Sequence, residues 1–349
     1  MQNSVAIVGA GVSGLTCAVV LAERGCDTAI FAEETGQHTT SAAAGAIWYP
    51  YDAEPAKQVI IWALETYKVL VDLARDKRAG VSMIELRTFA RSGEIQIPEW
   101  AIPLGARRLS NFVPIPDRGR RGGYKPVIPS GIEESLAIKQ SEIPPALSSG
   151  FALTVPLMDT TIYLNYLAQR FTVAGGTING GVRLAKLEDV SREFDLVVNC
   201  AGIGAKNLVP DPDLEPHRGQ VVIVPKLNVT CGMVCDDAPL MYAIPRANDC
   251  VLGGTNELSY DREVDPLATS RILTECSRAL NVDQPYVLME RVGLRPFRKS
   301  GVRVSTERLD DGRTVVHDYG HGGSGFTLSW GCAQKVLSLA EAAIADCLI

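Results

Sequence analysis

Three glycines with the spacing GxGxxG are the first residues in the chain whose types and spacing could do chemistry. They follow an apolar run, Ser4–Val8, and stand at the head of a helical pattern. In such a motif the first glycine turns the chain, the second admits a pyrophosphate and the third lets strand and helix pack closely, while the helix N-terminus faces the anion. The motif predicts dinucleotide binding by Gly9, Ala10, Gly11, Val12, Ser13 and Gly14.

A carboxylate that accepts hydrogen bonds from a ribose is expected about 20 residues beyond the motif, at the end of the next strand. Glu33 stands there, directly after the apolar run Ile30–Ala32, with Glu34 beside it. An acid at this position repels a 2′-phosphate, so NADP is disfavoured. The motif by itself leaves FAD and NAD as alternatives.

The elements around these residues predict an α/β fold that opens with a βαβ unit. Helices are predicted at 15–24, 54–76, 159–171, 265–280 and 334–349, and strands at 4–8, 27–31, 194–202, 220–224 and 241–254. Nucleotide-binding features occur at the start, middle and end of the chain. They predict a discontinuous Rossmann-like domain of residues 1–54, 151–205 and 300–349. Residues 55–150 and 206–299 are expected to form an α+β substrate-binding domain with a large mixed or antiparallel sheet.

Composition excludes several classes of function. The net charge of -6 and the lack of a basic block disfavour a nucleic acid partner. Nine cysteines without a CxxC pair, together with only four histidines, predict no zinc site and no other metal. Cys231 and Cys235 are close enough in the sequence for a disulfide, which the sequence leaves open.

The apolar run Val5–Ala22 is long enough to raise the question of a membrane span, but the glycine motif interrupts it. No Lys or Arg precedes it, so a signal peptide is also disfavoured. The last three residues, Cys347–Ile349, differ from the peroxisomal tripeptide. We therefore expect a cytoplasmic protein with no membrane partner, and a homodimer stays open.

Five further blocks, in the same order, resemble the D-amino acid oxidase family, which includes the D-aspartate oxidases. Together with the glycine motif they extend over the chain from end to end, and the last of them is specific on its own. The blocks are Thr39–Tyr51, His217–Gln220, Tyr242–Pro245 followed by Leu252–Thr255, Gly293–Pro296 and His317–Thr327.

The resemblance implies FAD as the cofactor. It places Thr39, Thr40 and Ser41 on phosphate and ribitol, and the backbone of Gly45, Ala46 and Ile47 near the N5 and O4 edge of the flavin. Glycines allow a backbone to approach a flat ring where side chains would clash, and Thr327 is expected to hydrogen-bond the flavin O2. The C-terminal residues expected to contact the flavin are Gly322, Gly323, Ser324, Gly325, Phe326 and Thr327.

The resemblance also implies an amino acid substrate. Arg295 would pair with the carboxylate through two parallel hydrogen bonds. Tyr242 would add a hydroxyl donor, and the carbonyl of Gly323 would accept from the amine. These attachments and a side-chain pocket admit one enantiomer with its Cα–H directed at flavin N5.

The implied reaction is oxidative deamination of neutral D-amino acids. A hydride passes from Cα to the flavin, O2 is reduced to hydrogen peroxide, and the imino acid hydrolyses to a 2-oxo acid and ammonia. No general base is required, so no residue is assigned a catalytic role. His317, His321 and Asp318 are expected to be structural.

Other interpretations stay open. Arg295 could be a structural partner of Glu290, and Tyr242 a core residue satisfied by backbone. Asn256 stands where the D-aspartate oxidases have a cation, although Arg246 and Arg298 could restore one. A D-aspartate oxidase or a glycine or sarcosine oxidase is the main alternative, followed by an NAD-dependent dehydrogenase and a non-enzymatic flavin-binding module.

The segment 225–241 is shorter than the lid of the vertebrate D-amino acid oxidases and lacks its tyrosine. We therefore expect a more open pocket that admits larger side chains.

Overall fold

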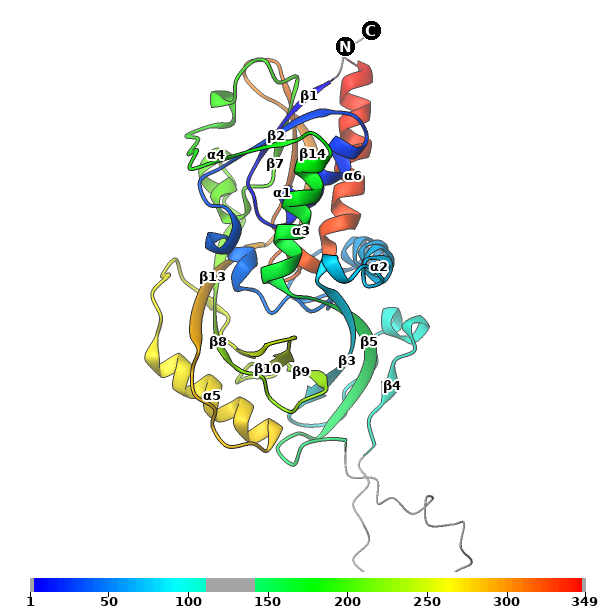
Figure 1. Cartoon of the computed structure of the whole chain (residues 1–349), viewed down its shortest axis with the longest axis vertical. Coiled ribbons are helices and arrows are strands. Elements are labelled where there is room, and N and C mark those ends of the chain that lie inside the picture. Colours follow the sequence, from blue (N-terminus) through cyan, green and yellow to red (C-terminus); the bar gives the residue numbers. More distant parts are fainter. Residues whose placement is uncertain (1–2, 111–141, 347–349) are drawn as a thin grey trace, which may run out of the picture.

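Two β-sheets, one at each end of the molecule, form the framework of the chain (Figure 1). A computed structural model describes residues 3–110 and 142–346. The first sheet lies near the two termini with helices packed beside it, and the second forms the opposite end. The predicted α/β fold with a Rossmann-like part and a second, mixed sheet is confirmed.

The first sheet has six strands in the order β14-β15-β7-β1-β2-β6. Its neighbours pair in parallel, except that β14 runs antiparallel to β15. Parallel strands with helices on their faces are buried on both sides, which explains the continuous apolar runs in the sequence. The strands are β1 (Ser4–Val8), β2 (Asp27–Ala32), β6 (Thr177–Gly180), β7 (Leu196–Asn199), β14 (Arg303–Arg308) and β15 (Thr314–Tyr319).

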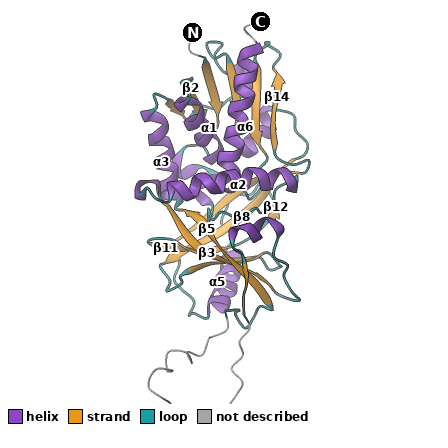
Figure 2. Ribbon diagram, turned by 90° about the vertical axis from the view of Figure 1, so that its right-hand side faces the viewer, coloured by secondary structure: helices purple, strands orange, loops and turns teal. Residues whose placement is uncertain are grey.

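Helices α1 (Val12–Glu23), α3 (Thr160–Val173) and α6 (Gly325–Asp346) pack beside this sheet, and α2 (Ala56–Leu73) crosses α6 (Figure 2). The Asp159 carboxylate caps α3 by accepting from the Thr161 amide, as its position before the helix predicts. The predicted start of α6 at residue 334 is wrong. Glycine and hydroxyl residues at 325–331 have low helix propensity, but packing against α1 and α2 stabilises the helical turns there.

The second sheet has nine strands in the order β12-β8-β11-β10-β9-β3-β5-β4, with β13 also paired to β8. Only the pair β3 and β9 is parallel, so the sheet is mixed and mainly antiparallel. The strands are β3 (Val81–Ala90), β4 (Arg107–Arg108), β5 (Ser149–Met158), β8 (Leu214–Pro225), β9 (Cys231–Cys235), β10 (Met241–Pro245), β11 (Asp249–Gly253), β12 (Glu257–Leu258) and β13 (Met289–Arg298).

Helix α5 (Pro266–Leu280) lies against the outer side of this sheet and begins where the sequence predicts. Asp265 accepts from the amide of Leu267, and Pro266 occupies the first turn, where its missing N–H costs nothing. The short helix α4 (Ala205–Leu208) follows β7. None of the helices in the described part of the chain has the length and apolarity that crossing a bilayer requires.

The two sheets share one apolar core. The largest buried cluster contains Ile7 and Val198 of the first sheet together with Leu86 and Phe151 of the second. Strand β5 belongs to the second sheet, although its residues 151–158 were assigned to the nucleotide-binding segments. The division into domains stays a prediction.

The disulfide that the sequence left open is not formed. Every cysteine among the described residues is a free thiol, and Cys231 and Cys235 both lie on strand β9. Residues four apart on a strand are separated by roughly 13 Å, whereas disulfide-bonded Cα atoms lie within about 7 Å. An intrastrand bridge between these two residues is therefore excluded.

The crossing of α2 and α6 depends on Gly331. A Cβ atom at this position would lie 2.4 Å from the carbonyl oxygen of Trp62, and the Gly331 amide donates to the Thr66 hydroxyl at 2.9 Å. We expect Gly331→Ala to lower the free energy of unfolding by about 1–3 kcal/mol through overpacking, measured by denaturant titration. Ser338→Ala, at an exposed position of the same helix, is the control. Equal stability of the two variants would contradict the tight crossing.

Candidate active site

One cavity of about 900 Å³ extends from the glycine motif at the end of β1 to the second sheet. At its nucleotide end it is lined by Gly9, Ala10, Gly11, Val12, Ser13, Glu33, Glu34, Thr39, Thr40 and Ser41. Gly45, Ala46 and Ile47 also line it, and a Cβ at Gly45 would meet Ile244 and Tyr242 of the second sheet. Its other lining residues include Gly322, Gly323, Gly325, Phe326, Thr327, Tyr242 and Arg295. The fold therefore brings together all the predicted site residues except Gly14 and Ser324.

Each glycine of the motif meets a different structural requirement. Gly9 has a φ of +112°, and a Cβ there would lie 2.4 Å from the Cys200 carbonyl oxygen. A Cβ at Gly14 would lie 2.0 Å from the Gly9 carbonyl oxygen, so Gly14 serves close packing of α1 on the turn and does not face the cavity. Gly11 offers no side chain to cap α1, whose N-terminal residues line the cavity. The positive end of the helix dipole is thus directed at the predicted pyrophosphate site.

The two predicted acids are both paired with arginines. Glu34 accepts a hydrogen bond from Arg262 at 2.7 Å, which joins the loop after β12 to the end of β2. Glu33 lies 3.8 Å from Arg183, a loose and exposed contact. Because Glu34 is already engaged, Glu33 is the acid better placed to accept from a ribose hydroxyl.

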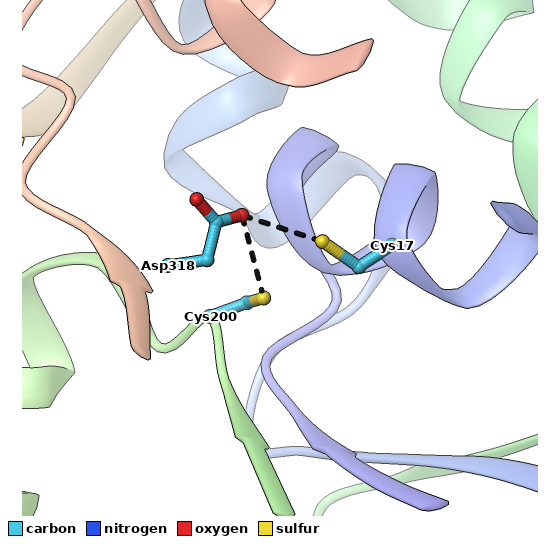
Figure 3. A group of neighbouring side chains, drawn as sticks. All are labelled: Cys17, Cys200 and Asp318. Carbon is cyan, nitrogen blue, oxygen red and sulfur yellow. Dashed lines mark hydrogen bonds between the residues drawn. The ribbon is translucent and has the colours of Figure 1, made fainter. Parts of the chain in front are cut away.

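A buried polar cluster lies directly behind the glycine motif (Figure 3). The Asp318 carboxylate on β15 lies 3.3 Å from the Cys17 thiol on α1 and 3.7 Å from the Cys200 thiol after β7. His321 contacts its other oxygen at 3.1 Å. The pKa of Cys17 is raised well above its ordinary value, mainly by a hydrogen bond with Cys200 and secondly by burial. Both thiols remain protonated donors, and the cluster ties three elements together beneath the turn.

His317 is enclosed in the first sheet and does not line the cavity. Its ring lies 3.3 Å from the Asn199 amide nitrogen and 3.1 Å from the Glu307 carboxylate. Burial, with a smaller contribution from Arg303, lowers the pKa of His317 to about 4. A neutral histidine with these partners has a structural role, in agreement with the sequence-based expectation.

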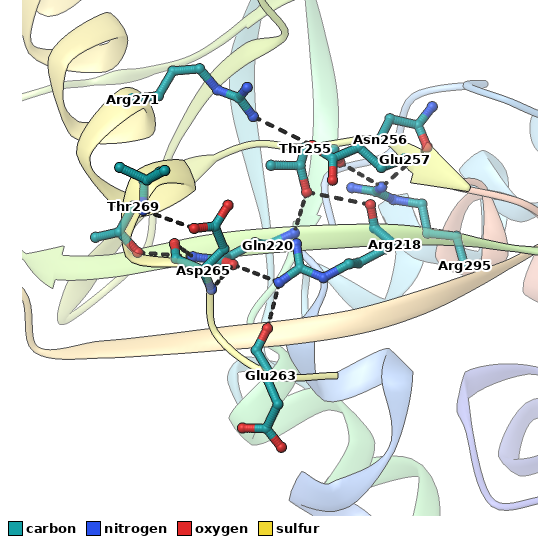
Figure 4. A network of polar contacts seen from close by, with 11 residues as sticks. Arg218, Gln220, Thr255, Asn256, Glu257, Glu263, Asp265, Thr269, Arg271 and Arg295 are labelled. Carbon is teal, nitrogen blue, oxygen red and sulfur yellow. Dashed lines mark hydrogen bonds and ion pairs between the residues drawn. The ribbon is translucent and has the colours of Figure 1, made fainter. Parts of the chain in front are cut away.

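At the other end of the cavity Arg295 projects from β13 (Figure 4). Its Nη1 donates to the Thr255 carbonyl at 2.8 Å, and a Cβ at Gly219 would lie 2.4 Å from the guanidinium. Glu290 accepts instead from the Thr269 hydroxyl, so the alternative pairing with Arg295 is wrong. Within residues 3–110 and 142–346 no carboxylate forms an ion pair with Arg295.

Tyr242 projects from β10 against two glycines. A Cβ at Gly253 would lie 2.0 Å from Cζ of the ring, and one at Gly254 would lie 2.8 Å from its hydroxyl. Burial raises the pKa of Tyr242, while the neighbouring Arg295 acts in the opposite direction. The tyrosine therefore stays protonated, with its hydroxyl beside the guanidinium. The two groups form a donor pair suited to a carboxylate.

Two predicted flavin contacts have other partners. The Thr327 hydroxyl donates to the Tyr49 carbonyl at 3.0 Å and accepts from the Tyr49 amide at 3.1 Å. The Ser324 hydroxyl accepts from the Tyr51 amide at 2.8 Å and donates to the Tyr51 carbonyl. Both side chains at the start of α6 therefore fix the backbone of residues 49–51.

Three residues at the substrate end were not assigned from the sequence: Tyr49, Tyr51 and Asp236. The Tyr51 ring lies against Gly323, where a Cβ would be 2.5 Å from Cδ1. Its hydroxyl accepts from Asn256 at 3.2 Å, and burial raises the pKa of Tyr51 to about 12. The two tyrosines belong to the block that resembles D-amino acid oxidases, which was a usable signal. Asp236 belongs to no recognisable motif, so the sequence gives no sign that it lies in the site.

The two arginines considered as extra cations do not reach the cavity. Arg246 pairs with Asp249 through two hydrogen bonds of 2.6 and 2.7 Å, and Arg298 pairs with Asp211 at 2.8 Å. Neither arginine lines the cavity. The expectation that they could serve a second substrate carboxylate is not supported by their positions.

Comparison with known proteins gives the family. The family described as FAD dependent oxidoreductase matches residues 4–339. The D-amino-acid oxidase of Rubrobacter xylanophilus is 38% identical over 97% of this chain and 96% of its own length. That of Streptomyces coelicolor is 35% identical over 97% of each. The chain belongs to the FAD-dependent D-amino acid oxidase family.

This D-amino acid oxidase family member also resembles solved structures in its fold. The glycine oxidase of Geobacillus kaustophilus aligns with a TM-score of 0.76 over 98% of this chain and 95% of its own, at 18% identity. The cofactor of the family is FAD, and the cavity fits it. A glycine turn at a helix N-terminus, an acid after β2 and a long continuous hollow lined by glycine backbone are the features that a flavin dinucleotide requires.

The turn at Gly9 gives a test of cofactor binding. Gly9→Ala places a methyl group against Cys200 in a left-handed backbone conformation, so we expect the purified variant to lose most of its bound flavin. The measurement is visible flavin absorbance relative to protein absorbance. Gly25→Ala is matched in φ, at +88°, but its Cβ meets nothing within 4 Å. If Gly9→Ala keeps as much flavin as Gly25→Ala, the motif does not hold the cofactor.

Proposed function

We propose that the chain is a D-amino acid oxidase that carries out FAD-dependent oxidative deamination. The observation that carries this proposal is the pair Arg295 and Tyr242 at the end of a cavity that begins at the dinucleotide motif. A guanidinium without a carboxylate partner of its own in the described chain, next to a protonated phenol, is a site for a carboxylate.

The residues of the site position the substrate. Arg295 binds the carboxylate through parallel hydrogen bonds, and the Tyr242 hydroxyl donates to it. The Gly323 carbonyl accepts from the amine, while Tyr51 packs against the same residue and limits where the amine can lie. Fixing the carboxylate, amine and side chain selects one hand of the substrate, and near-attack placement provides much of the rate.

The chemistry that bound FAD supplies is acceptance of a hydride from Cα, followed by reoxidation with O2 to give hydrogen peroxide. The protein needs no general base, because the lone pair of a neutral amine expels the hydride. The imino acid hydrolyses in water to a 2-oxo acid and ammonia.

Neutral D-amino acids fit this site better than acidic ones. The cavity is lined by three arginines among the described residues, and two of them, Arg183 and Arg262, lie beside the acids at the nucleotide end. Asn256 stands beside Arg295 and brings no charge. A second carboxylate, as in D-aspartate, therefore finds no additional cation. A glycine or sarcosine oxidase remains the second candidate, favoured by the shared fold.

The proposal extends to the wider organisation of the protein. All strands of the first sheet fall within residues 1–54, 151–205 and 300–349, which supports the nucleotide-binding segments, with β5 as the strand at the boundary. The partners are a D-amino acid and O2, and we place the activity in the cytoplasm. A homodimer is compatible with this assignment.

The direct test is anaerobic mixing of the purified yellow protein with D- and L-amino acids. We expect D-alanine, D-valine and D-methionine to bleach the flavin and their L-enantiomers to leave it oxidised. Bleaching by glycine and sarcosine alone would select the second candidate. Colour that survives every D-amino acid would exclude the oxidase.

The carboxylate site is tested by Arg295→Leu. We expect a loss of roughly 2–5 kcal/mol in kcat/KM for D-amino acids, because the substrate carboxylate is left desolvated and unpaired. Arg295→Lys keeps the charge without the planar fork and should recover only part of the loss. Flavin content is the control for folding. Wild-type kinetics in Arg295→Leu would place the carboxylate elsewhere.

A further inference from the structure

We propose that Asp236, together with Tyr49, forms a subsite for a cationic side chain, so that this enzyme accepts basic D-amino acids in preference to neutral ones of the same shape. The inference rests on the proposed function and names its substrate class. It depends on a carboxylate that lines the substrate end of the cavity and forms no ion pair with any of the described residues.

The position of Asp236 is set by the sheet. It follows the last residue of β9 directly and begins the short connection 236–240 to β10, the strand that carries Tyr242. Asp236 and Leu240 of this connection line the cavity. The connection has no tyrosine, and its five residues are too few to form a long lid. A carboxylate thus lines the same cavity as Tyr242 and Arg295.

The hydrogen bonding of Asp236 is incomplete. The Tyr49 hydroxyl donates to its Oδ2 at 3.3 Å. Within the described ranges, no Lys, Arg or His forms an ion pair with Asp236, in contrast to the acids at the nucleotide end. A carboxylate can accept about four hydrogen bonds, so Asp236 retains acceptor capacity that faces the cavity.

The electrostatic surroundings favour a cation at this place. Although Asp236 is exposed, desolvation by the surrounding protein raises its pKa to about 6. The hydrogen bond from Tyr49 lowers this pKa, and the charges of Asp237 and Asp52 raise it. Asp236 is therefore largely ionised at neutral pH without a compensating charge. An ammonium or guanidinium group next to it would relieve the repulsion among the three acids.

The substrate end of the cavity carries charges of both signs. Arg295 and Asp236 both line it. Burial is the main cause of the raised pKa of Tyr51, which Arg295 lowers and which Asp52 and Asp236 raise further. A substrate with a carboxylate at one end and a cation at the other matches this arrangement. Tyr49 and Tyr51 also present aromatic surface to the cavity, and such surface attracts cations.

The same carboxylate could instead contact the α-ammonium group, which every amino acid carries. The two assignments differ in a measurable way, because only a side-chain subsite distinguishes substrates that share the α-ammonium group. D-Arginine and D-citrulline have the same shape and differ in charge. D-Lysine and D-norleucine provide a second pair.

The experiment measures kcat/KM of the FAD-loaded enzyme for both pairs. We expect the wild type to favour D-arginine over D-citrulline, and Asp236→Asn to lower this ratio by roughly 10- to 100-fold, the size of one charge-assisted hydrogen bond. Asp237→Asn removes the neighbouring charge and is the matched control, because Asp237 accepts from the Arg91 amide at 2.8 Å and does not line the cavity. We expect it to leave the ratio within about threefold, because Asp237, unlike Asp236, does not line the cavity and cannot contact a substrate side chain bound there.

The outcomes are distinguishable. A wild-type ratio near one, or a ratio that Asp236→Asn leaves unchanged, would overturn the subsite even though neutral D-amino acids still bleach the flavin. An equal loss for D-arginine and D-citrulline would assign Asp236 to the α-ammonium group instead. If no D-amino acid reduces the flavin, the proposed function fails first. The wild-type ratio needs no variant, so the inference stays testable if Asp236→Asn does not fold.

Discussion

The half-buried guanidinium of Arg295 is the interaction on which the substrate end of the molecule depends. It has a backbone carbonyl, that of Thr255, as its short-range partner, and no carboxylate of the described chain neutralises it. Its place is fixed by the pairing of β13 with β8 over the whole of Met289–Arg298, and the missing side chain of Gly219 on β8 leaves space for the guanidinium. A cation held so rigidly by backbone keeps its charge for a ligand.

The same rigidity is needed between the two sheets, because the cavity runs from one to the other. Ser324 and Thr327 at the start of α6 hold the backbone of Tyr49 and Tyr51, so a helix of the first sheet positions two side chains of the substrate end. The Glu34–Arg262 pair is a second contact, between the end of β2 and the loop after β12. Together with the shared apolar core, these contacts keep the two ends of the cavity in one fixed relation.

Features with local causes could be predicted from the sequence. The strand before Gly9, the glycine turn and the caps at Asp159 and Asp265 are all set by neighbouring residues, and the structure has them where expected. The start of α6 could not be predicted, because packing overrides the low helix propensity of its first turns. The membership of β5 in the second sheet depends on pairing with β3, a contact between distant segments.

Asp236 shows why a residue outside any motif escapes sequence analysis. Asp236 becomes relevant to the site only because a short turn places it in the same cavity as Arg295. No fixed spacing in the sequence relates the two residues. The consequence for selectivity follows from Coulomb's law. At an effective dielectric constant of about 20, like charges roughly 6 Å apart repel by about 3 kcal/mol. An acidic side chain would meet this repulsion in addition to lacking a cation. The pocket therefore disfavours acidic substrates for two reasons: Asp236 repels a second carboxylate, and the described residues offer that carboxylate no additional cation.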